Sequence, residues 1–316
     1  MATTPLLLHP RSAFIGLALP VLALGLALAA PRPAAAAVPH HDKVAVVIME
    51  NKSYAQASSQ VYTIALMASG ATFTNSVAVA HPSQPNYLAL WFGHTLGYTT
   101  DACPLTAPLS FENLGHACEA AGLSWRAYSE NLAVVGSTAC SYDGNATTGL
   151  YTRKHEPWTY SANVDHNRER PYTDLAADIA GGTLPNLIFV IPNNCHNSHN
   201  SSTPGCTVSD ADAWLASNLP ALKAALGPTG LLILTWDEND NSAGNRILTV
   251  FSGPQVIPGA VSAQAINHYS VVRTICEALG LQPFNIAADM STVDGVWTQV
   301  VKTDARSWGR LKTLYR

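Results

Sequence analysis

Three uninterrupted apolar segments, each followed at once by polar residues, constrain the fold of this chain more than any other feature. The segments span 43–49 (KVAVVIM), 186–191 (NLIFVI) and 231–236 (LLILTW). Short apolar runs of this kind are typical of strands that are buried on both faces, as in parallel sheets. A helical pattern separates the last two, because capping residues at 209–212 precede an amphipathic segment that ends near residue 226. The sequence therefore predicts an α/β fold, a three-layer sandwich with a mostly parallel central sheet.

Weaker patterns complete this alternation of strands and helices. Strands are expected at 71–79, 123–128 and 247–251, and helices at 63–69, 85–91, 111–121 and 270–279. Three of the helices stop at a glycine, which favours a helix end. The remaining helix, 85–91, begins with a proline, which suits a first turn.

The N-terminal segment resembles an export signal. Twenty residues without a charge lie between Arg11 and Arg32, and an Ala-x-Ala site follows at 34–36. The stretch is long enough to span a bilayer, but Pro20 and the glycine and alanine content favour a cleaved signal. We predict a signal peptide over 1–37, a secreted, extracellular protein and no stable membrane span after cleavage.

Composition and cysteine content narrow the class of protein. With 47% hydrophobic residues the chain is too apolar for a disordered protein, and a net charge of −4 argues against a nucleic-acid partner. All six cysteines follow the predicted signal, and their spacing matches no zinc signature. An even number in an exported chain suggests disulfides, although six cysteines allow 15 pairings. The pairs that we expect are Cys103–Cys140, Cys195–Cys206 and Cys118–Cys276.

Polar residues follow each of the three apolar strands. Glu50 and Asn51 follow the first, residues 193–199 the second, and Asp237 and Glu238 the third. Ligands of α/β sheets bind beyond the carboxyl ends of the strands. Carboxylates from two strands together with an amide are hard oxygen ligands for a divalent cation. Such residues can also be simple turn and capping residues, but three clusters at one sheet edge favour a site.

Ser83 is the candidate nucleophile. No Gly-x-Ser-x-Gly motif is present, which argues against an α/β-hydrolase esterase. Ser83 lies between Pro82 and Pro85, just before an expected helix whose N-terminus favours an anionic group. Metal coordination can lower the pKa of a serine hydroxyl. The alternative is an ordinary N-cap serine.

Basic residues in three separate segments suit a phosphorylated substrate. They are Lys154 and His155 in the run 153–158, His199, and His268. Cations and histidines near an anionic nucleophile can bind a phosphoryl group and stabilise charge on its oxygens.

Six blocks of the chain together resemble a known family. They are 50–53 (ENKS), 81–87 (HPSQPNY), 153–158 (RKHEPW), 212–215 (DAWL), 235–238 (TWDE) and 268–269 (HY). In this order they resemble bacterial secreted acid phosphatases of the phosphoesterase family, the acid phosphatase and phosphocholine-type phospholipase C branch of the alkaline-phosphatase superfamily. The likeness extends from about Val44 to Trp297. It implies an alkaline-phosphatase-like fold, with a single phosphoesterase catalytic domain over 38–316.

The resemblance also implies roles for individual residues. One divalent cation is expected, because an acidic ligand for a second ion is not evident. Oxygen ligands favour calcium, magnesium or manganese over zinc. The implied metal ligands are Glu50, Asn51, Ser83, Asp237 and Glu238. Ser83 is also the implied nucleophile. Lys154 and His155 are implied to bind the phosphoryl group, and His199 and His268 to act in catalysis.

The expected function is that of a secreted, metal-dependent acid phosphatase. It would hydrolyse phosphate monoesters, either small molecules or a phosphorylated lipid headgroup, through a phosphoserine intermediate. Asn197 and Asn200 stand where close relatives have acidic residues, which bears on the role of His199 and on substrate choice.

Two other functions use the same residues. The first is a phosphodiesterase of phospholipase C type, although such relatives usually carry further C-terminal domains and this chain stops about twenty residues after Trp297. The second is a calcium-stabilised secreted binding protein. Ser83 argues against the second, because a structural ion needs no reactive hydroxyl.

Overall fold

The computed structural model describes residues 1–2, 37–105, 108–145 and 149–298. Contacts group the chain from Ala35 onward into one unit. The predicted signal peptide lies almost wholly outside the described residues.

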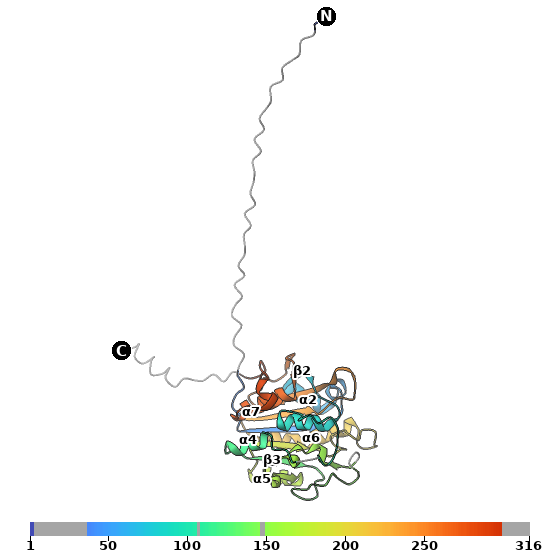
Figure 1. The fold of residues 1–316 in the computed structure, drawn as a ribbon, viewed down its shortest axis with the longest axis vertical. Helices are drawn as coiled ribbons and strands as arrows, with labels where there is room; N and C mark the ends of the chain where they lie inside the picture. The colour runs from blue at the N-terminus through green and yellow to red at the C-terminus, as the bar shows by residue number, and fades with distance from the viewer. Residues whose placement is uncertain (3–36, 106–107, 146–148, 299–316) are drawn as a thin grey trace, which may run out of the picture. The chain divides into compact units, whose positions relative to one another are not determined.

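A nine-stranded sheet forms the centre of this unit in the described part of the chain (Figure 1). Its order is β10-β2-β9-β8-β1-β7-β3-β6, with β11 beside β2. Strand β9 runs antiparallel to β2 and β8, and the other pairings are parallel. The predicted α/β fold with a mostly parallel sheet is confirmed. The strands are β1 (Lys43–Met49), β2 (Ala71–Val77), β3 (Trp125–Ser129), β6 (Glu169–Pro171), β7 (Leu187–Ile191), β8 (Gly230–Trp236), β9 (Arg246–Ser252), β10 (Ala260–Ser262) and β11 (Ile266–Asn267); β4 (Ser141–Tyr142) and β5 (Tyr151–Thr152) form a separate hairpin.

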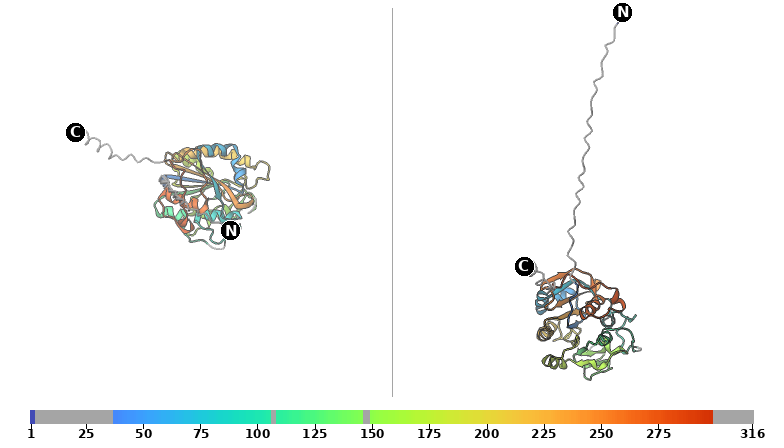
Figure 2. Two further views of the ribbon diagram at one scale, coloured as in Figure 1. Left: turned by 90° about the horizontal axis from the view of Figure 1, so that it is seen from above. Right: turned by 90° about the vertical axis from the view of Figure 1, so that its left-hand side faces the viewer.

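Helices cover both faces of the sheet (Figure 2). Helices α3 (Ser83–Phe92), α4 (Leu114–Ala120) and α7 (His268–Leu279) share one apolar core with the sheet, and α1 (Tyr54–Ser58), α2 (Val61–Ser69), α5 (Thr173–Gly181) and α6 (Val208–Ala225) share the other. Strand β1 contributes alternate residues to the two cores, since Val46 faces the first and Val47 the second. This double burial is why the strand has no polar residue after Lys43.

Short 3-10 helices fill several connections. They are η1 (Arg153–His155), η2 (Pro157–Tyr160), η3 (His166–Arg168), η4 (Ala243–Asn245) and η5 (Asn285–Asp289). The sequence did not predict α1, α5, β6 or these turns, because they are too short or too polar to show a periodic apolar pattern.

Side-chain caps move two helix boundaries from their predicted positions. Helix α4 begins three residues later than expected, because the side chain of Asn113 accepts the N–H of His116 and caps the helix there. Helix α6 begins at Val208, where Thr207 and Asp210 form a capping box.

Gly70 ends α2 as predicted, but for a different physical reason. Its backbone is extended, with φ −131° and ψ −161°, whereas Gly280 after α7 is left-handed with φ 72°. A Cβ atom on Gly70 would lie 2.3 Å from the carbonyl oxygen of Phe251. Glycine is required here because the end of α2 packs directly on the backbone of β9.

Two of the three expected disulfides are present, Cys103–Cys140 and Cys195–Cys206. The third prediction is wrong, because Cys118 and Cys276 are free thiols. Both are fully buried in one apolar core, and this burial raises the pKa of each thiol to about 12. No helix within the described ranges is long and apolar enough to cross a membrane.

Candidate active site

The three predicted polar clusters meet at one edge of the sheet. Strands β8, β1 and β7 are parallel neighbours, so their carboxyl ends point the same way. The N–H of Glu50 donates to the carbonyl oxygen of Asn197, and that of Asp237 to Met49, both at 2.9 Å. The backbones that leave the three strands are therefore joined directly.

Strand β2 delivers Ser83 to the same edge. Asn86, in the first turns of α3, holds the preceding loop: its side-chain oxygen accepts the N–H groups of Val79 and Ala80 at 3.1 and 3.0 Å. Its amide nitrogen donates to the carbonyl oxygen of Ala80 at 2.9 Å. Helix α3 then begins at Ser83 itself, which fixes the position of the hydroxyl.

Three oxygen atoms converge around the Ser83 hydroxyl. Its Oγ lies 3.1 Å from Glu50 Oε2, 3.2 Å from Glu238 Oε1 and 3.5 Å from Asn51 Oδ1. Ser83 and Glu50 are at most 1% exposed and Glu238 is 5% exposed. One hydroxyl proton cannot satisfy three acceptors, so the cluster is electron-rich and short of positive charge.

Burial perturbs the three carboxyl groups strongly. Loss of solvent, opposed in part by Lys154, raises the pKa of Glu50 to about 7. Loss of solvent and the neighbouring Asp237 raise the pKa of Glu238 to about 8. The pKa of Asp237 is also raised well above its ordinary value, by burial and then by Glu50. Adjacent buried carboxylates are stable in ionised form only beside a compensating charge.

The donor set fits a hard divalent cation. Asp237 Oδ1 accepts the N–H of Asn51 at 3.1 Å, while Oδ2 is buried and has no hydrogen-bond partner among the described residues. The amide oxygen of Asn51 faces the two glutamates; turned over, its nitrogen would donate to Glu50 at 3.3 Å and Glu238 at 3.1 Å. No group of three or more His, Cys, Asp or Glu side chains in the described segments forms a ready cage for a metal ion. The fit depends on the amide and the hydroxyl as well as on carboxylates.

Lys154 supplies a buried cation to this edge. Its Nζ lies 2.8 Å from Asp101 Oδ2 and 3.4 Å from His199 Nε2. Burial alone would lower the pKa of Lys154, but the carboxylates of Glu50 and Asp101 outweigh it and raise the pKa above its ordinary value. Lys154 is therefore charged at any physiological pH.

His155 lies beneath Glu50. Its Nε2 is 3.2 Å from Glu50 Oε1, its Nδ1 is 3.0 Å from Thr152 Oγ1, and its ring stacks on Tyr87 with centroids 4.7 Å apart. Burial, followed by the charge of Lys154, holds its pKa well below the ordinary value. The ring is 2% exposed, and its Nε2 makes no hydrogen bond within the described residues.

His268 begins α7 and contacts the strand exit at Asp237. Its Nε2 donates to the carbonyl oxygen of Asp237 at 2.6 Å. Burial lowers its pKa to about 4, an effect that this hydrogen bond opposes. The histidine is thus neutral and supports the backbone that carries Asp237.

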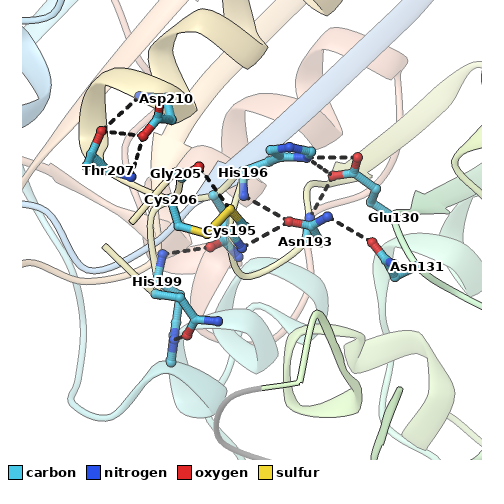
Figure 3. The surroundings of a disulfide bond; sticks show 12 residues. Glu130, Asn131, Asn193, Cys195, His196, His199, Gly205, Cys206, Thr207 and Asp210 are labelled. Atoms are coloured by element: carbon cyan, nitrogen blue, oxygen red, sulfur yellow. Dashed lines mark hydrogen bonds and ion pairs between the residues drawn. A yellow bond between two sulfur atoms is a disulfide. The ribbon is translucent and has the colours of Figure 1, made fainter. Parts of the chain in front are cut away.

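His199 lies on a loop closed by the disulfide Cys195–Cys206 (Figure 3). Asn193 organises the start of the loop by accepting the N–H groups of Cys195 and His196, both at 2.9 Å. The N–H of His199 donates to Asn197 Oδ1 at 2.8 Å.

The departure from the family pattern at Asn197 has a structural role. This side chain is fully buried and donates to the carbonyl oxygen of Pro192 at 3.3 Å. It therefore shapes the loop that presents His199, whose own side chain is partly exposed.

The structure adds four residues to the predicted set. His81 Nδ1 lies 2.5 Å from Glu238 Oε2, and the hydroxyl of Tyr87 donates to Glu50 Oε1. Lys52 Nζ donates to the carbonyl oxygen of Asn51 at 2.9 Å and is 6% exposed. Asp101 pairs with Lys154, as described above. His81, Tyr87 and Lys52 lie inside the blocks that carry the family resemblance, so those blocks could have indicated them, whereas Asp101 lies outside every block.

Comparison with known proteins identifies a family and a shared fold. Residues 53–282 match the Phosphoesterase family. The chain is 36% identical over 268 residues to a phosphatidylinositol-3-phosphatase of Mycobacterium tuberculosis, covering 84% of this chain and 85% of that protein. It is 28% identical over 251 residues to a phosphate-repressible acid phosphatase of Penicillium chrysogenum, covering 76% of this chain and 59% of that one. A Vibrio parahaemolyticus protein of the alkaline phosphatase superfamily has the same fold, with a TM-score of 0.59, 11% identity and coverage of 82% and 72%.

Proposed function

The chain belongs to the phosphoesterase family, and we propose that it is a phosphatase that hydrolyses phosphate monoesters with Ser83 as its nucleophile. The observation that carries the proposal is the Ser83 hydroxyl, buried at the start of α3 and within 3.2 Å of carboxylate oxygens from two strand exits. The two relatives named above are both phosphatases. This favours a monoesterase over the phosphodiesterase and over the calcium-stabilised binding protein.

In the first step Ser83 Oγ attacks phosphorus while the ester P–O bond breaks, which gives a phosphoserine and an alcohol. The serine proton is released to water, while Glu238, 3.2 Å away and paired through its other oxygen with His81 at the partly exposed rim, orients the hydroxyl. Lys154 stabilises charge on the phosphoryl oxygens. Water then attacks the phosphoserine, phosphate leaves, and Ser83 recovers its proton.

His199 is the histidine best placed to protonate the leaving alcohol. It is partly exposed and its Nε2 lies 3.4 Å from Lys154 Nζ. Burial, followed by Lys154, lowers its pKa below the ordinary 6.5. It therefore carries a proton only in acidic solution, so we expect maximal turnover on the acidic side of neutrality. His268 instead supports the backbone of Asp237, and the buried ring of His155 packs beside Glu50.

We propose a divalent cation among Glu50, Asn51, Ser83, Asp237 and Glu238. When bound, it would offset the carboxylate charge and lower the pKa of the serine hydroxyl. Oxygen-only ligands favour calcium, magnesium or manganese over zinc.

The metal proposal is tested without an activity measurement. Protein dialysed against a chelator should gain thermal stability on addition of MgCl₂, MnCl₂ or CaCl₂, because a ligand of the folded state alone stabilises it by roughly 2.7 kcal/mol at one hundred times its dissociation constant. The variant Asp237→Asn should lose most of this gain. If none of the three salts raises the melting temperature of the wild-type protein, the metal proposal is wrong.

The nucleophile is tested with Ser83→Ala. Turnover of p-nitrophenyl phosphate should be lost, and acid quenching with labelled substrate should trap phosphate on the wild-type protein alone. Ser252→Ala is the matched control, because Ser252 is also buried but lies at the opposite end of β9. Near-normal turnover by Ser83→Ala would exclude the proposed mechanism.

For the substrate we propose a phosphate monoester, either a small molecule or a phosphoinositide headgroup. The relative from M. tuberculosis is named for the second class. The test compares three substrates: p-nitrophenyl phosphate, phosphatidylinositol 3-phosphate in phosphatidylcholine vesicles, and the diester bis-p-nitrophenyl phosphate. We expect hydrolysis of one or both monoesters and not of the diester. The two disulfides support export to an oxidising compartment.

A further inference from the structure

The loop that follows α3 returns to the N-terminal end of the same helix. It leaves the helix through Gly93, which is left-handed with φ 59°. Asp101 on this loop accepts the backbone N–H of Gln84 with Oδ1 at 2.9 Å. Its other oxygen, Oδ2, accepts a hydrogen bond from Lys154 Nζ at 2.8 Å. One carboxylate therefore joins the residue next to Ser83 to the buried lysine.

This double contact fixes the position of the Lys154 ammonium relative to Ser83, which matters for phosphoryl transfer. A lysine side chain has four rotatable bonds, and an ammonium free to move gives little stabilisation to a transition state. Here Nζ is bound to a planar carboxylate whose second oxygen is bound to the backbone of α3. Because α3 also begins with Ser83, the cation and the nucleophile are held in one frame.

The disulfide Cys103–Cys140 secures this carboxylate from both sides. Cys103 is two residues beyond Asp101, and the carbonyl oxygen of Cys140 accepts the N–H of Arg153 at 3.0 Å. Arg153 immediately precedes Lys154.

The side chain of Arg153 strengthens the same connection. Its guanidinium donates to the carbonyl oxygens of Thr138 and Thr159, both at 2.9 Å. The disulfide thus links the segment that carries Asp101 to the segment that carries Lys154, and the ion pair closes the ring.

We propose that Asp101 is a positioning residue that holds Lys154 and the N-terminus of α3 in register for phosphoryl transfer, and that the Cys103–Cys140 disulfide keeps it there. The inference rests on the proposed phosphatase function, since it assigns Lys154 to the phosphoryl group. Asp101 acts through Lys154 and touches no reacting atom. Its negative charge would by itself repel a phosphate, so its benefit comes from geometry.

The test is a double-mutant cycle on p-nitrophenyl phosphate hydrolysis. Asp101→Asn should lower kcat/KM by about tenfold to a hundredfold, as is usual when a partner that orients a functional group is removed. In a Lys154→Met background the same substitution should have less than a twofold effect, because the group that it orients is gone. Equal effects in both backgrounds would overturn the proposal.

Two further variants keep the test decisive. Asp101→Glu should recover at least part of the lost rate, because it keeps the carboxylate that binds Lys154. If Asp101 only filled space, the longer side chain would not recover the rate. Asp174→Asn is the matched control, because Asp174 is about one-third exposed and pairs with Arg170 at 2.7 Å in an ion pair between β6 and α5. It should retain wild-type kinetics; a loss equal to that of Asp101→Asn would contradict the inference.

The disulfide is tested by Cys103→Ser/Cys140→Ser. If the disulfide acts by holding Asp101, this variant should have a lower kcat/KM than the wild type. Asp101→Asn should then lower kcat/KM less in this variant than in the wild type. An unchanged kcat/KM would refute the role of the disulfide. If Ser83→Ala loses turnover but Asp101→Asn keeps the wild-type rate, this inference alone is wrong. If Ser83→Ala stays active, the proposed function itself is wrong.

Discussion

Two buried glutamates behind the active-site edge make the stability of this protein depend on pH. Glu156 and Glu169 are each 1% exposed, and the hydroxyl of Ser129 lies between them, 2.8 Å from Glu156 Oε2 and 3.4 Å from Glu169 Oε1. Burial raises the pKa of Glu169 to about 7, although the indole of Trp158, the hydroxyls of Tyr151 and Ser129 and the charge of Arg153 oppose the rise. Burial and then Glu169 raise the pKa of Glu156 well above its ordinary value.

The sign and size of the effect follow from linkage. A raised pKa means that the folded protein binds the proton more tightly than the unfolded chain does. The resulting stability is fully present below pH 4.5, the ordinary pKa, and is lost as the pH rises through about 7. One carboxyl group with this change contributes roughly 3 kcal/mol, at about 1.4 kcal/mol for each pH unit.

The substitution Glu169→Gln removes this contribution, together with the charge that helps to raise the pKa of Glu156. Glutamine keeps an oxygen that can accept the hydroxyl of Tyr151, 3.1 Å away in the wild type, but carries no charge. Urea unfolding should show the wild type losing roughly 2.5 kcal/mol more than Glu169→Gln between pH 5 and pH 8. Glu50 and Glu238 titrate in both proteins, so their contributions cancel in the comparison.

A second glutamate provides the control. Glu277→Gln removes a one-third-exposed carboxylate that pairs with Arg273 at 2.8 Å, and its pH dependence should match the wild type. If Glu169→Gln and the wild type lose stability equally over this range, Glu169 does not retain its proton in the folded state and the reasoning is wrong.

Two further outcomes are expected from local geometry. Gly70→Ala should destabilise the protein by about 1–3 kcal/mol, read as a lower melting temperature, because its Cβ would lie 2.3 Å from the carbonyl oxygen of Phe251; an unchanged melting temperature would show that the end of α2 moves freely. Cys195→Ser/Cys206→Ser should lower the free energy of unfolding in urea by roughly 2–3 kcal/mol, since it opens a loop with a sequence separation of 11 residues. Equal stability to the wild type would contradict a structural role for this disulfide.

The site edge was predictable because it follows from sheet geometry. Continuous apolar strands are typical of parallel sheets, and the carboxyl ends of parallel neighbours meet at one edge. This brought Glu50 and Asp237 together although they are 187 positions apart. Ser83 could be placed because prolines and a helix start are local signals. The burial of His155 and His268 could not be predicted, since neither the depth of a histidine nor its hydrogen-bond partner is encoded in spacing.

Contacts between irregular loops also escaped prediction. Asp101 and Lys154 belong to segments without periodic pattern, and only the folded chain shows that they meet. The predicted pair Cys118–Cys276 failed for the opposite reason. Elimination among six cysteines gave a pair, but the structure buries both thiols unpaired in the apolar core of α4 and α7.

The reversed direction of β9 has a practical consequence. Because β9 starts at the catalytic edge and runs away from it, the connection that follows, residues 253–259, turns at the other end of the sheet before β10 begins. Length changes there are separated from the chemistry by the whole height of a strand. A reporter peptide or an immobilisation tag inserted beside Gly259 should leave catalytic turnover intact, so this turn is the natural attachment point for engineering the enzyme.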